Sequence, residues 1–327
     1  MSKLILEEVS CNLCGGMEHR LLYEGMDNRY LETPREKFRL VRCSRCGLVY
    51  LNPRPTAESL ALFYPPCYSP YQQKVGVETP RLRGLRGLGR KIWLWIGERR
   101  HEERRSLINR LYPLPGRLLG VGCATGRFLA QMQPHGWQVA GVEWNAQAAA
   151  RAREALGAEV HTGDVLSCPW PDASFDVVTL WHVLEHLPDP KAALEKIIQL
   201  LRPGGRVVIL APSAANAEFW LLGRLDHHPV DIPRHLYHFS PSTLTALLKQ
   251  TGFQIERTKT FSWNVTPRLT SVLQEQCQRR QSQALVGRAI RSVGMLSAWG
   301  IGMATAALLG LFAKGPGFII VGRKAAH

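Results

Sequence analysis

Strand and helix patterns alternate from about residue 112 onward, and this alternation restricts the fold more than any other feature of the sequence. Apolar runs of strand length lie at 117–121, 137–144, 175–181, 206–212, 253–261 and 317–324. Helical patterns lie between most of them, at 125–136, 145–157, 188–205 and 240–252. Strands that alternate with helices predict an α/β fold with a mainly parallel sheet, covered by helices on both faces.

A glycine-rich turn follows the first of these strands. Gly122 and Gly126 bracket it in the stretch GVGCATG, before the first helix. Glycines in such a turn let the backbone approach a ligand, and the start of the helix offers free N–H groups. Glu143 ends the second strand, 21 residues after Gly122, where an acid can accept hydrogen bonds from both hydroxyls of a ribose. These features predict a nucleotide-like cofactor and leave a dinucleotide open.

Two C-x-x-C-G units precede this region, Cys11–Cys14 and Cys43–Cys46, with 28 residues between them. Each unit is a tight turn that directs two sulfurs to one point. Four thiolates form the closed tetrahedral shell of a structural zinc site. The sequence therefore predicts a zinc ribbon at Cys11, Cys14, Cys43 and Cys46, without chemistry at the metal.

The net charge of +15 comes from two segments. Residues 79–117 carry eleven Arg or Lys against three Glu, and residues 265–327 carry eight against one. The first contains an apolar stripe at helical spacing, and 292–313 is a run of 22 residues without a charge. The first segment could form an interfacial helix on anionic lipid or a linker helix packed on the protein. The run 292–313 could contact the membrane or be buried in the protein. The N-terminus lacks the pattern of a signal peptide, so we expect a cytoplasmic protein, with peripheral contact to the inner face of the membrane.

The later segments resemble class I S-adenosylmethionine-dependent methyltransferases. The resemblance rests on HTGDVLSCPWPDASFDVVTLWHVLEHLPDP and LRPGGRVVILAPS, which follow in the order of that family. It implies a Rossmann-like, doubly wound, mainly parallel seven-stranded sheet with an antiparallel last strand, and it implies that Asp164 lies near the adenine. The cofactor-binding residues that we predict are Gly120, Gly122, Cys123, Gly126, Glu143, Trp144, Asp164, Val165 and Trp181.

This turn departs from the family pattern at two positions. Gly120 stands where the family has an acid that orders the amino-acid end of the methyl donor, and Ala124 replaces a glycine. We therefore expect weakened binding of the methyl donor, and tighter binding on Gly120→Asp.

The ribbon sequence together with VDIPRHLYHFSPSTLTALLKQTGF looks like a bacterial subgroup with a zinc ribbon ahead of the methyltransferase domain. That resemblance implies a sugar, glycan or glycolipid as the methyl acceptor. The domains that we expect are the ribbon at 1–78, basic amphipathic linker helices at 79–111, the methyltransferase domain at 112–264 and 315–324, and an apolar helical insertion at 265–314.

Methyl transfer to a hydroxyl needs a group that takes the proton. Two clusters lie after strands: His182, Glu185 and His186, and a loop with Asp231, Arg234, His235 and His238. We favour His235 as the base, with His182 and Asp231 as further catalytic candidates; packing roles for these histidines stay open. Spacing of i and i+4 also permits a metal at His182 and His186, which nearby Pro188 disfavours because it interrupts a helix.

The leading hypothesis is therefore S-adenosylmethionine-dependent O- or C-methylation of a sugar or lipid-linked glycan intermediate. The alternatives are an RNA methyltransferase, for which the basic segments suit phosphates, and a non-catalytic zinc-ribbon scaffold. Nucleic acid is the less favoured partner because the basic segments carry long apolar runs. The sequence does not determine the oligomeric state.

Overall fold

The computed structural model describes residues 3–27, 29–30, 32–72, 101–215, 231–261 and 317–326. Most of the predicted basic linker, residues 79–100, and the whole predicted apolar insertion, residues 265–314, lie outside these residues. The chain divides into two compact units. The first unit comprises Met1–Pro65, Trp181–Glu195 and Val208–Arg323, and the second comprises Pro66–Leu180, Lys196–Val207 and Lys324–His327.

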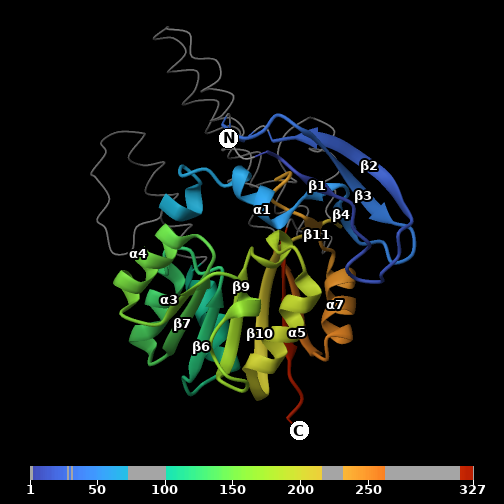
Figure 1. Cartoon of the computed structure of the whole chain (residues 1–327). Helices are drawn as coiled ribbons and strands as arrows, with labels where there is room; N and C mark the ends of the chain where they lie inside the picture. Colours follow the sequence, from blue (N-terminus) through green and yellow to red (C-terminus); the bar gives the residue numbers. More distant parts are fainter. Residues whose placement is uncertain are drawn as a thin grey trace, which may run out of the picture. The chain divides into compact units, whose positions relative to one another are not determined.

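A seven-stranded sheet confirms the predicted fold class, with the strand order β12-β13-β10-β9-β6-β7-β8 (Figure 1). Its strands are β6 (Arg117–Val121), β7 (Gln138–Glu143), β8 (Val160–Thr162), β9 (Phe175–Trp181), β10 (Leu201–Pro212), β12 (Gln254–Phe261) and β13 (Gly317–Arg323). β6 pairs in parallel with β7 and β9, and β7 with β8. The last strand, β13, pairs antiparallel with β12, as predicted.

Helices of the second unit follow the capping signals in the sequence. α4 (Ala146–Leu156) begins after Asn145, whose side chain accepts a hydrogen bond from the Ala148 amide, and it ends at Gly157 with φ 57°. α3 (Arg127–Met132) is shorter than expected because Pro134 starts a 3-10 turn, η3 (Gln133–His135). Both helices pack against β7 (Figure 1). Residues 101–111 of the predicted linker are helical.

One predicted boundary differs from the structure. α5 spans Pro190–Leu200 and β10 begins at Leu201, slightly before the Pro203-Gly204-Gly205 stretch at which the sequence pattern predicted the exit from the helix. Pro203 lacks a backbone N–H, and Gly204 has φ 76°, so residues 201–205 cannot continue the helical hydrogen bonds. These residues extend the strand instead.

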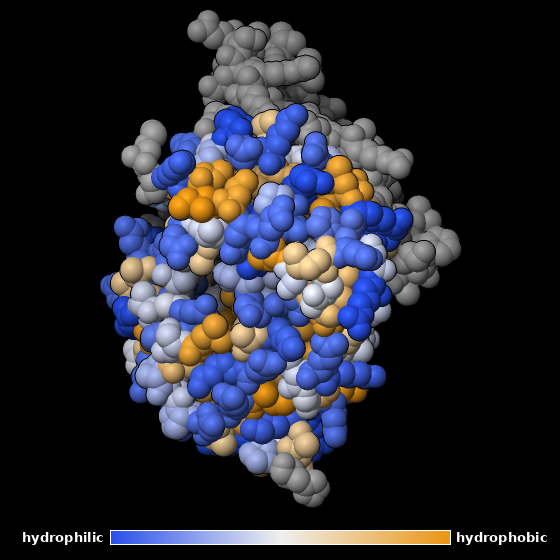
Figure 2. Space-filling view, turned by 45° about the vertical axis from the view of Figure 1, so that its right-hand side comes forward, coloured by the Kyte–Doolittle hydropathy of each residue, from blue (hydrophilic) through white to orange (hydrophobic). Residues whose placement is uncertain are grey.

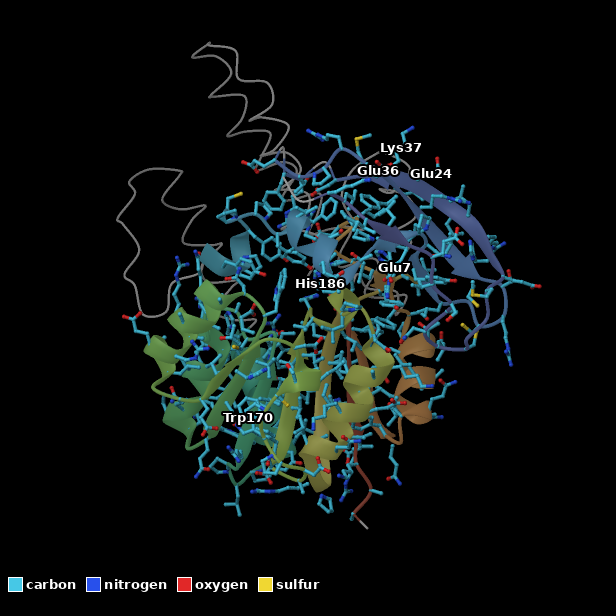
Figure 3. The ribbon with its side chains drawn as sticks, in the orientation of Figure 1. Glu7, Glu24, Glu36, Lys37, Trp170 and His186 are labelled. Carbon is cyan, nitrogen blue, oxygen red and sulfur yellow. The ribbon has the colours of Figure 1, made fainter. Side chains whose placement is uncertain are left out.

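The first unit contains a second sheet of four strands, in the order β11-β4-β3-β2. The hairpin of β2 (His19–Met26) and β3 (Lys37–Cys43) is followed by β4 (Val49–Leu51), and Figure 3 shows Glu24 and Lys37 on this hairpin. β11 (Tyr237–His238) comes from far along the chain and pairs antiparallel with β4. The histidine-rich loop of the sequence is thereby tied to this four-stranded sheet.

The remaining elements of the first unit are short, apart from one helix. α7 (Pro241–Gln250) starts with a capping box between Ser240 and Thr243 and buries Leu244, Leu247 and Leu248. The others are β1 (Leu6–Glu7), β5 (Arg54–Pro55), α1 (Ala57–Leu60), η1 (Ala61–Phe63) and η5 (Leu184–His186). The second unit adds η2 (Ser69–Gln72) and η4 (Val165–Ser167).

The visible surface mixes polar residues with small apolar groups (Figure 2). Exposed large hydrophobic side chains include Leu114 at 83% and Met17 at 58%. Among the described helices, none combines the length and the hydrophobicity that a membrane span requires. The apolar run 292–313 lies outside the described residues, so its contact with membrane stays a prediction.

Candidate active site

The glycine turn of the second unit has left-handed backbone at three positions. Gly122, Ala124 and Gly126 have φ of 63°, 49° and 80°. The amide of Cys123 donates to the Val142 carbonyl at 3.1 Å, which ties the turn to β7. Left-handed backbone is unstrained for glycine but costs an alanine about 1 kcal/mol. Ala124 therefore adopts the turn conformation of a glycine with some strain.

Glu143 closes over this turn from the end of β7. One carboxylate oxygen accepts from the Ala124 amide and the other from the Asn145 amide, both at 2.9 Å. The side chain is 3% exposed, and burial raises its pKa while these backbone amides lower it. A carboxylate has about four lone-pair sites, so each oxygen keeps capacity to accept a further hydrogen bond. This is the arrangement that would bind the two hydroxyls of a ribose.

Gly120 lies inside β6, and its missing side chain is replaced by Leu129 of α3. A Cβ atom at Gly120 would meet three carbon atoms of Leu129 at 3.1–3.3 Å. Leu129 is itself buried at 1% exposure. A side chain at position 120 therefore requires Leu129 to shift by a few tenths of an ångström, and tighter donor binding on Gly120→Asp stays a prediction.

The other predicted cofactor residues of the second unit lie near the ends of β6, β7 and β8. Asp164 is exposed and caps η4 by accepting from the Leu166 amide at 3.1 Å. Val165 is buried, Cys123 is half-buried, and Trp144 is 44% exposed beside Glu143. Trp181 ends β9 and belongs to the first unit.

The sequence patterns did not indicate Tyr71, whose hydroxyl interacts with Glu143 and Trp144 beside the glycine turn. Burial raises the pKa of the Tyr71 hydroxyl most, and the negative charge of Glu143 raises it further. Trp144 hydrogen-bonds to the same hydroxyl. Arg151 of α4 holds the backbone by donating to the Tyr71 carbonyl at 2.7 Å. No motif marks a lone tyrosine so far from the glycine turn, so only the tertiary structure identifies it.

The first unit brings the two predicted histidine clusters together. The Leu236 amide donates to the Glu185 carbonyl at 2.9 Å, and the rings of His186 and His235 lie 4.7 Å apart at 82°. His182 has φ 58°, and its Nδ1 lies 3.3 Å from Oε1 of Glu185. His238 is buried in β11 with its ring 5.8 Å from that of His235. Glu185, His186, His235 and His182 therefore lie in one region of the first unit, and Figure 3 labels His186.

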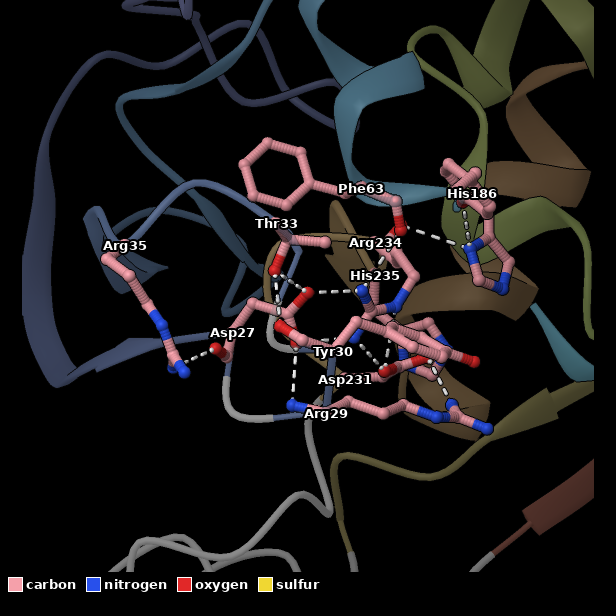
Figure 4. Close-up of polar contacts among 11 residues, drawn as sticks. Asp27, Arg29, Tyr30, Thr33, Arg35, Phe63, His186, Asp231, Arg234 and His235 are labelled. Carbon is pink, nitrogen blue, oxygen red and sulfur yellow. Dashed lines mark hydrogen bonds and ion pairs between the residues drawn. The ribbon is translucent and has the colours of Figure 1, made fainter. Parts of the chain in front are cut away.

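A buried ion-pair network holds the loop that carries His235 (Figure 4). Arg234 is fully buried and donates to both oxygens of Asp27, at 2.6 and 2.9 Å. It also donates to Asp231 at 2.8 and 3.0 Å and to the Phe63 carbonyl at 3.1 Å. Arg29 adds a contact to Asp231 at 3.2 Å. All five N–H donors of a guanidinium are thus used.

These charges decide which groups can accept a proton. Burial alone would raise the pKa of Asp231, but Arg234 and Arg29 hold it well below its usual value. Burial lowers the pKa of His186, although Glu185 and Asp231 act in the opposite direction. Asp231 is thus an ionised partner of the arginines, and His186 is a neutral imidazole.

The four predicted zinc ligands also meet in the first unit. Sγ of Cys11 lies 3.4 Å from that of Cys46, and Sγ of Cys14 lies 3.5 Å from that of Cys43. Both turns have the same backbone bonds, because Gly15 donates to Cys11 and Gly47 donates to Cys43. Sulfurs around a tetrahedral zinc lie about 3.8 Å apart for bonds of about 2.3 Å. The cluster is compatible with zinc.

The comparisons with known proteins agree with this geometry. Residues 96–258 match the methyltransferase domain family. An O-methyltransferase of Penicillium expansum is 32% identical over 48% of this chain and 59% of its own length. A ubiquinone biosynthesis O-methyltransferase of Idiomarina loihiensis is 35% identical over 33% of this chain and 46% of its own length. The chain thus spans about half the length of these relatives.

One solved structure, from Galdieria sulphuraria, is described as a sarcosine dimethylglycine methyltransferase. It superposes with a TM-score of 0.51 at 19% identity, over 70% of this chain and 86% of that chain, which supports the fold alone. The sheet and the family match together lead to one conclusion. This chain carries a class I S-adenosylmethionine-dependent methyltransferase domain.

Proposed function

We propose that the protein transfers the methyl group of S-adenosylmethionine to a hydroxyl of a sugar or lipid-linked glycan intermediate. The observation that carries the methyl-donor part is Glu143, a buried carboxylate fixed by two backbone amides beside the glycine turn. Similarity to O-methyltransferases supports oxygen as the acceptor atom. The glycan part rests on the resemblance of the ribbon sequence and the 230–253 segment to the bacterial subgroup.

The methyl donor is already activated, so the protein mainly aligns the acceptor oxygen with the methyl group and excludes water. We propose His182 as the base that takes the hydroxyl proton. About a third of its side chain, 32%, is exposed, whereas that of His235 is only 8% exposed. Because a carboxylate only accepts hydrogen bonds, Glu185 keeps a proton on Nδ1 of His182 and leaves Nε2 as the basic nitrogen.

In this proposal, His235 and Asp231 have a positioning role and do not take the proton themselves. Nε2 of His235 lies 3.8 Å from Asp231, and Asp231 is fixed by Arg234. We expect His182→Ala and His235→Ala each to lower turnover strongly while affinity for the methyl donor barely changes. Loss of donor affinity in parallel with turnover would make either histidine structural.

The test has two arms. Calorimetry with S-adenosylmethionine is expected to give one binding site per chain, and Glu143→Ala is expected to remove it. Labelled methyl donor is then offered with fractionated lipid, glycan and RNA. Label in the glycan or lipid fraction supports the proposal; label in RNA favours the nucleic-acid alternative, and absence of donor binding favours a scaffold.

We also propose that Cys11, Cys14, Cys43 and Cys46 hold a structural zinc. The paired turns and sulfur distances support it. Elemental analysis is expected to give one zinc per chain that a Cys14→Ser variant loses. Zinc retained at full stoichiometry in that variant contradicts the assignment.

A further inference from the structure

A second group of metal-ligand types lies in the first unit, apart from the four cysteines. One ligand atom each from Glu185, His186 and His235 lies within 4.8 Å of the others. The three residues come from two loops that meet through the bond from the Leu236 amide to the Glu185 carbonyl. Figure 4 shows His186 and His235 in this region. Two imidazoles and one carboxylate form a ligand set that zinc and other first-row cations accept.

The hydrogen bonds of His186 favour a role as ligand. Its Nδ1 lies 3.0 Å from the Arg234 carbonyl and 2.8 Å from the Tyr64 hydroxyl. A carbonyl oxygen can only accept, so Nδ1 carries the proton and the lone pair is on Nε2. Histidines that bind metals usually donate their other ring N–H to a carbonyl or carboxylate in this way.

One carboxylate oxygen of Glu185 lacks a hydrogen-bond partner among the described residues. Its side chain is 1% exposed. Oε1 faces Nδ1 of His182, whereas Oε2 has no hydrogen-bond partner within the part of the chain that the structure describes. A buried carboxylate oxygen without a partner costs free energy unless a ligand satisfies it. A cation would do so.

The position of His235 completes the set. Its ring stands nearly perpendicular to that of His186, at 82°, so two nitrogens can face one point without the rings stacking. Oδ2 of Asp231 lies 3.8 Å from Nε2 of His235. Arg234 in turn fixes Asp231, so the ring of His235 is oriented by a buried network.

We propose that Glu185, His186 and His235 bind a divalent first-row transition cation of the zinc or cobalt type. Ligand atoms around such a cation lie about 3.0–3.5 Å apart for bonds of about 2.1 Å. The observed separation of up to 4.8 Å therefore requires small side-chain rotations on binding. The i and i+4 spacing in the sequence pairs His182 with His186. In the folded chain, His186 lies instead with Glu185 and with His235 from another loop.

Three protein ligands leave coordination positions open, as in catalytic zinc sites. An acceptor hydroxyl bound there would lose its proton more readily, because the cation stabilises the alkoxide. This role rests on the proposed function, whereas binding of the cation does not.

The test uses the untagged full chain with its cysteine cluster loaded with zinc. Co²⁺ is titrated into this protein, followed by calorimetry and visible absorption. We expect one Co²⁺ per chain with the weak absorption of nitrogen and oxygen ligands and without new sulfur-to-cobalt bands. E185Q and H235N are each expected to weaken Co²⁺ affinity at least about tenfold. His161→Asn, which removes a histidine of the second unit, is the matched control and is expected to bind like the unmodified chain.

Elemental analysis of the unmodified chain after incubation with Co²⁺ and gel filtration gives a readout that needs no variant: one zinc and one cobalt per chain support the site, and zinc alone overturns it. Equal Co²⁺ affinity in E185Q, H235N and the control also overturns it. Calorimetry with S-adenosylhomocysteine on the same samples separates the two proposals. Binding of that compound without Co²⁺ binding refutes the cation and leaves the methyltransferase function intact.

Discussion

Replacing Arg234 tests whether the buried ion pairs hold the histidine-bearing loop in place. Arg234→Met removes all five donors of a side chain that is fully buried. Asp231 keeps Arg29 as a partner, but the fully buried Asp27 keeps only the Thr33 hydroxyl and the Arg29 amide, both at 2.9 Å. Breaking a buried pair by removing one partner costs about 3–5 kcal/mol, because the other charge stays buried without compensation.

The free energy of unfolding, measured by urea denaturation followed by circular dichroism, gives the magnitude. We expect Arg234→Met to lose about 3–5 kcal/mol and the double variant with Asp27→Leu to regain most of it, because apolar residues replace both charges. Arg39→Met is the matched control: its contact to Glu24 is 3.9 Å long and half-exposed, and such pairs contribute about 0–1 kcal/mol. A loss in Arg234→Met no larger than in the control, or a double variant as unstable as the single one, would refute the reasoning.

Three further substitutions test the glycine turn. Glu143→Gln places an amide N–H₂ opposite a backbone N–H that donates to the carboxylate in the unmodified chain. We therefore expect about 1–3 kcal/mol lower stability and at least tenfold weaker binding of the methyl donor by calorimetry. The exposed Glu154→Gln is the control and is expected to change neither quantity. Ala124→Gly relieves left-handed backbone and is expected to raise the unfolding free energy by about 1 kcal/mol; a decrease would show that the alanine side chain contributes packing. Gly120→Asp is expected to lower stability by about 1–3 kcal/mol through overpacking against Leu129, and the double variant with Leu129→Ala to cost less than the sum of the two single variants; additive losses would contradict the shared space.

Much of the sheet could be predicted because strand and helix patterns are local. Asn145 and Gly157 delimit α4 where the capping rule places its ends, and the alternation of elements leads to a parallel sheet without knowledge of any contact. Glu143 could be predicted as a ribose-binding acid because such an acid follows the glycine turn at a regular distance, and this role stays a prediction. The Pro203-Gly204-Gly205 stretch predicts the exit from α5, and the helix ends slightly before it, at Leu200.

The histidine residues show where local patterns stop. The clusters around His182 and His235 could each be found from their residue types. The choice of the proposed base between them depended on the exposure and the hydrogen-bond partners of each side chain. His235 is buried and His182 is partly exposed, and for this reason we propose His182 as the base in place of His235. The network also includes Asp27, 207 positions before Arg234, and no pattern in the sequence pairs them.

By itself the sequence determined the order of strands and helices, the glycine turn with its acid and the two cysteine pairs, because each depends on residues close together in the chain. Only the tertiary structure decided that Leu129 packs beside Gly120, that β11 joins the four-stranded sheet, and that Glu185 and His186 meet His235. These contacts join distant segments, and they depend on how side-chain volumes and buried charges are matched across the folded chain. Such matching has no regular spacing in the sequence.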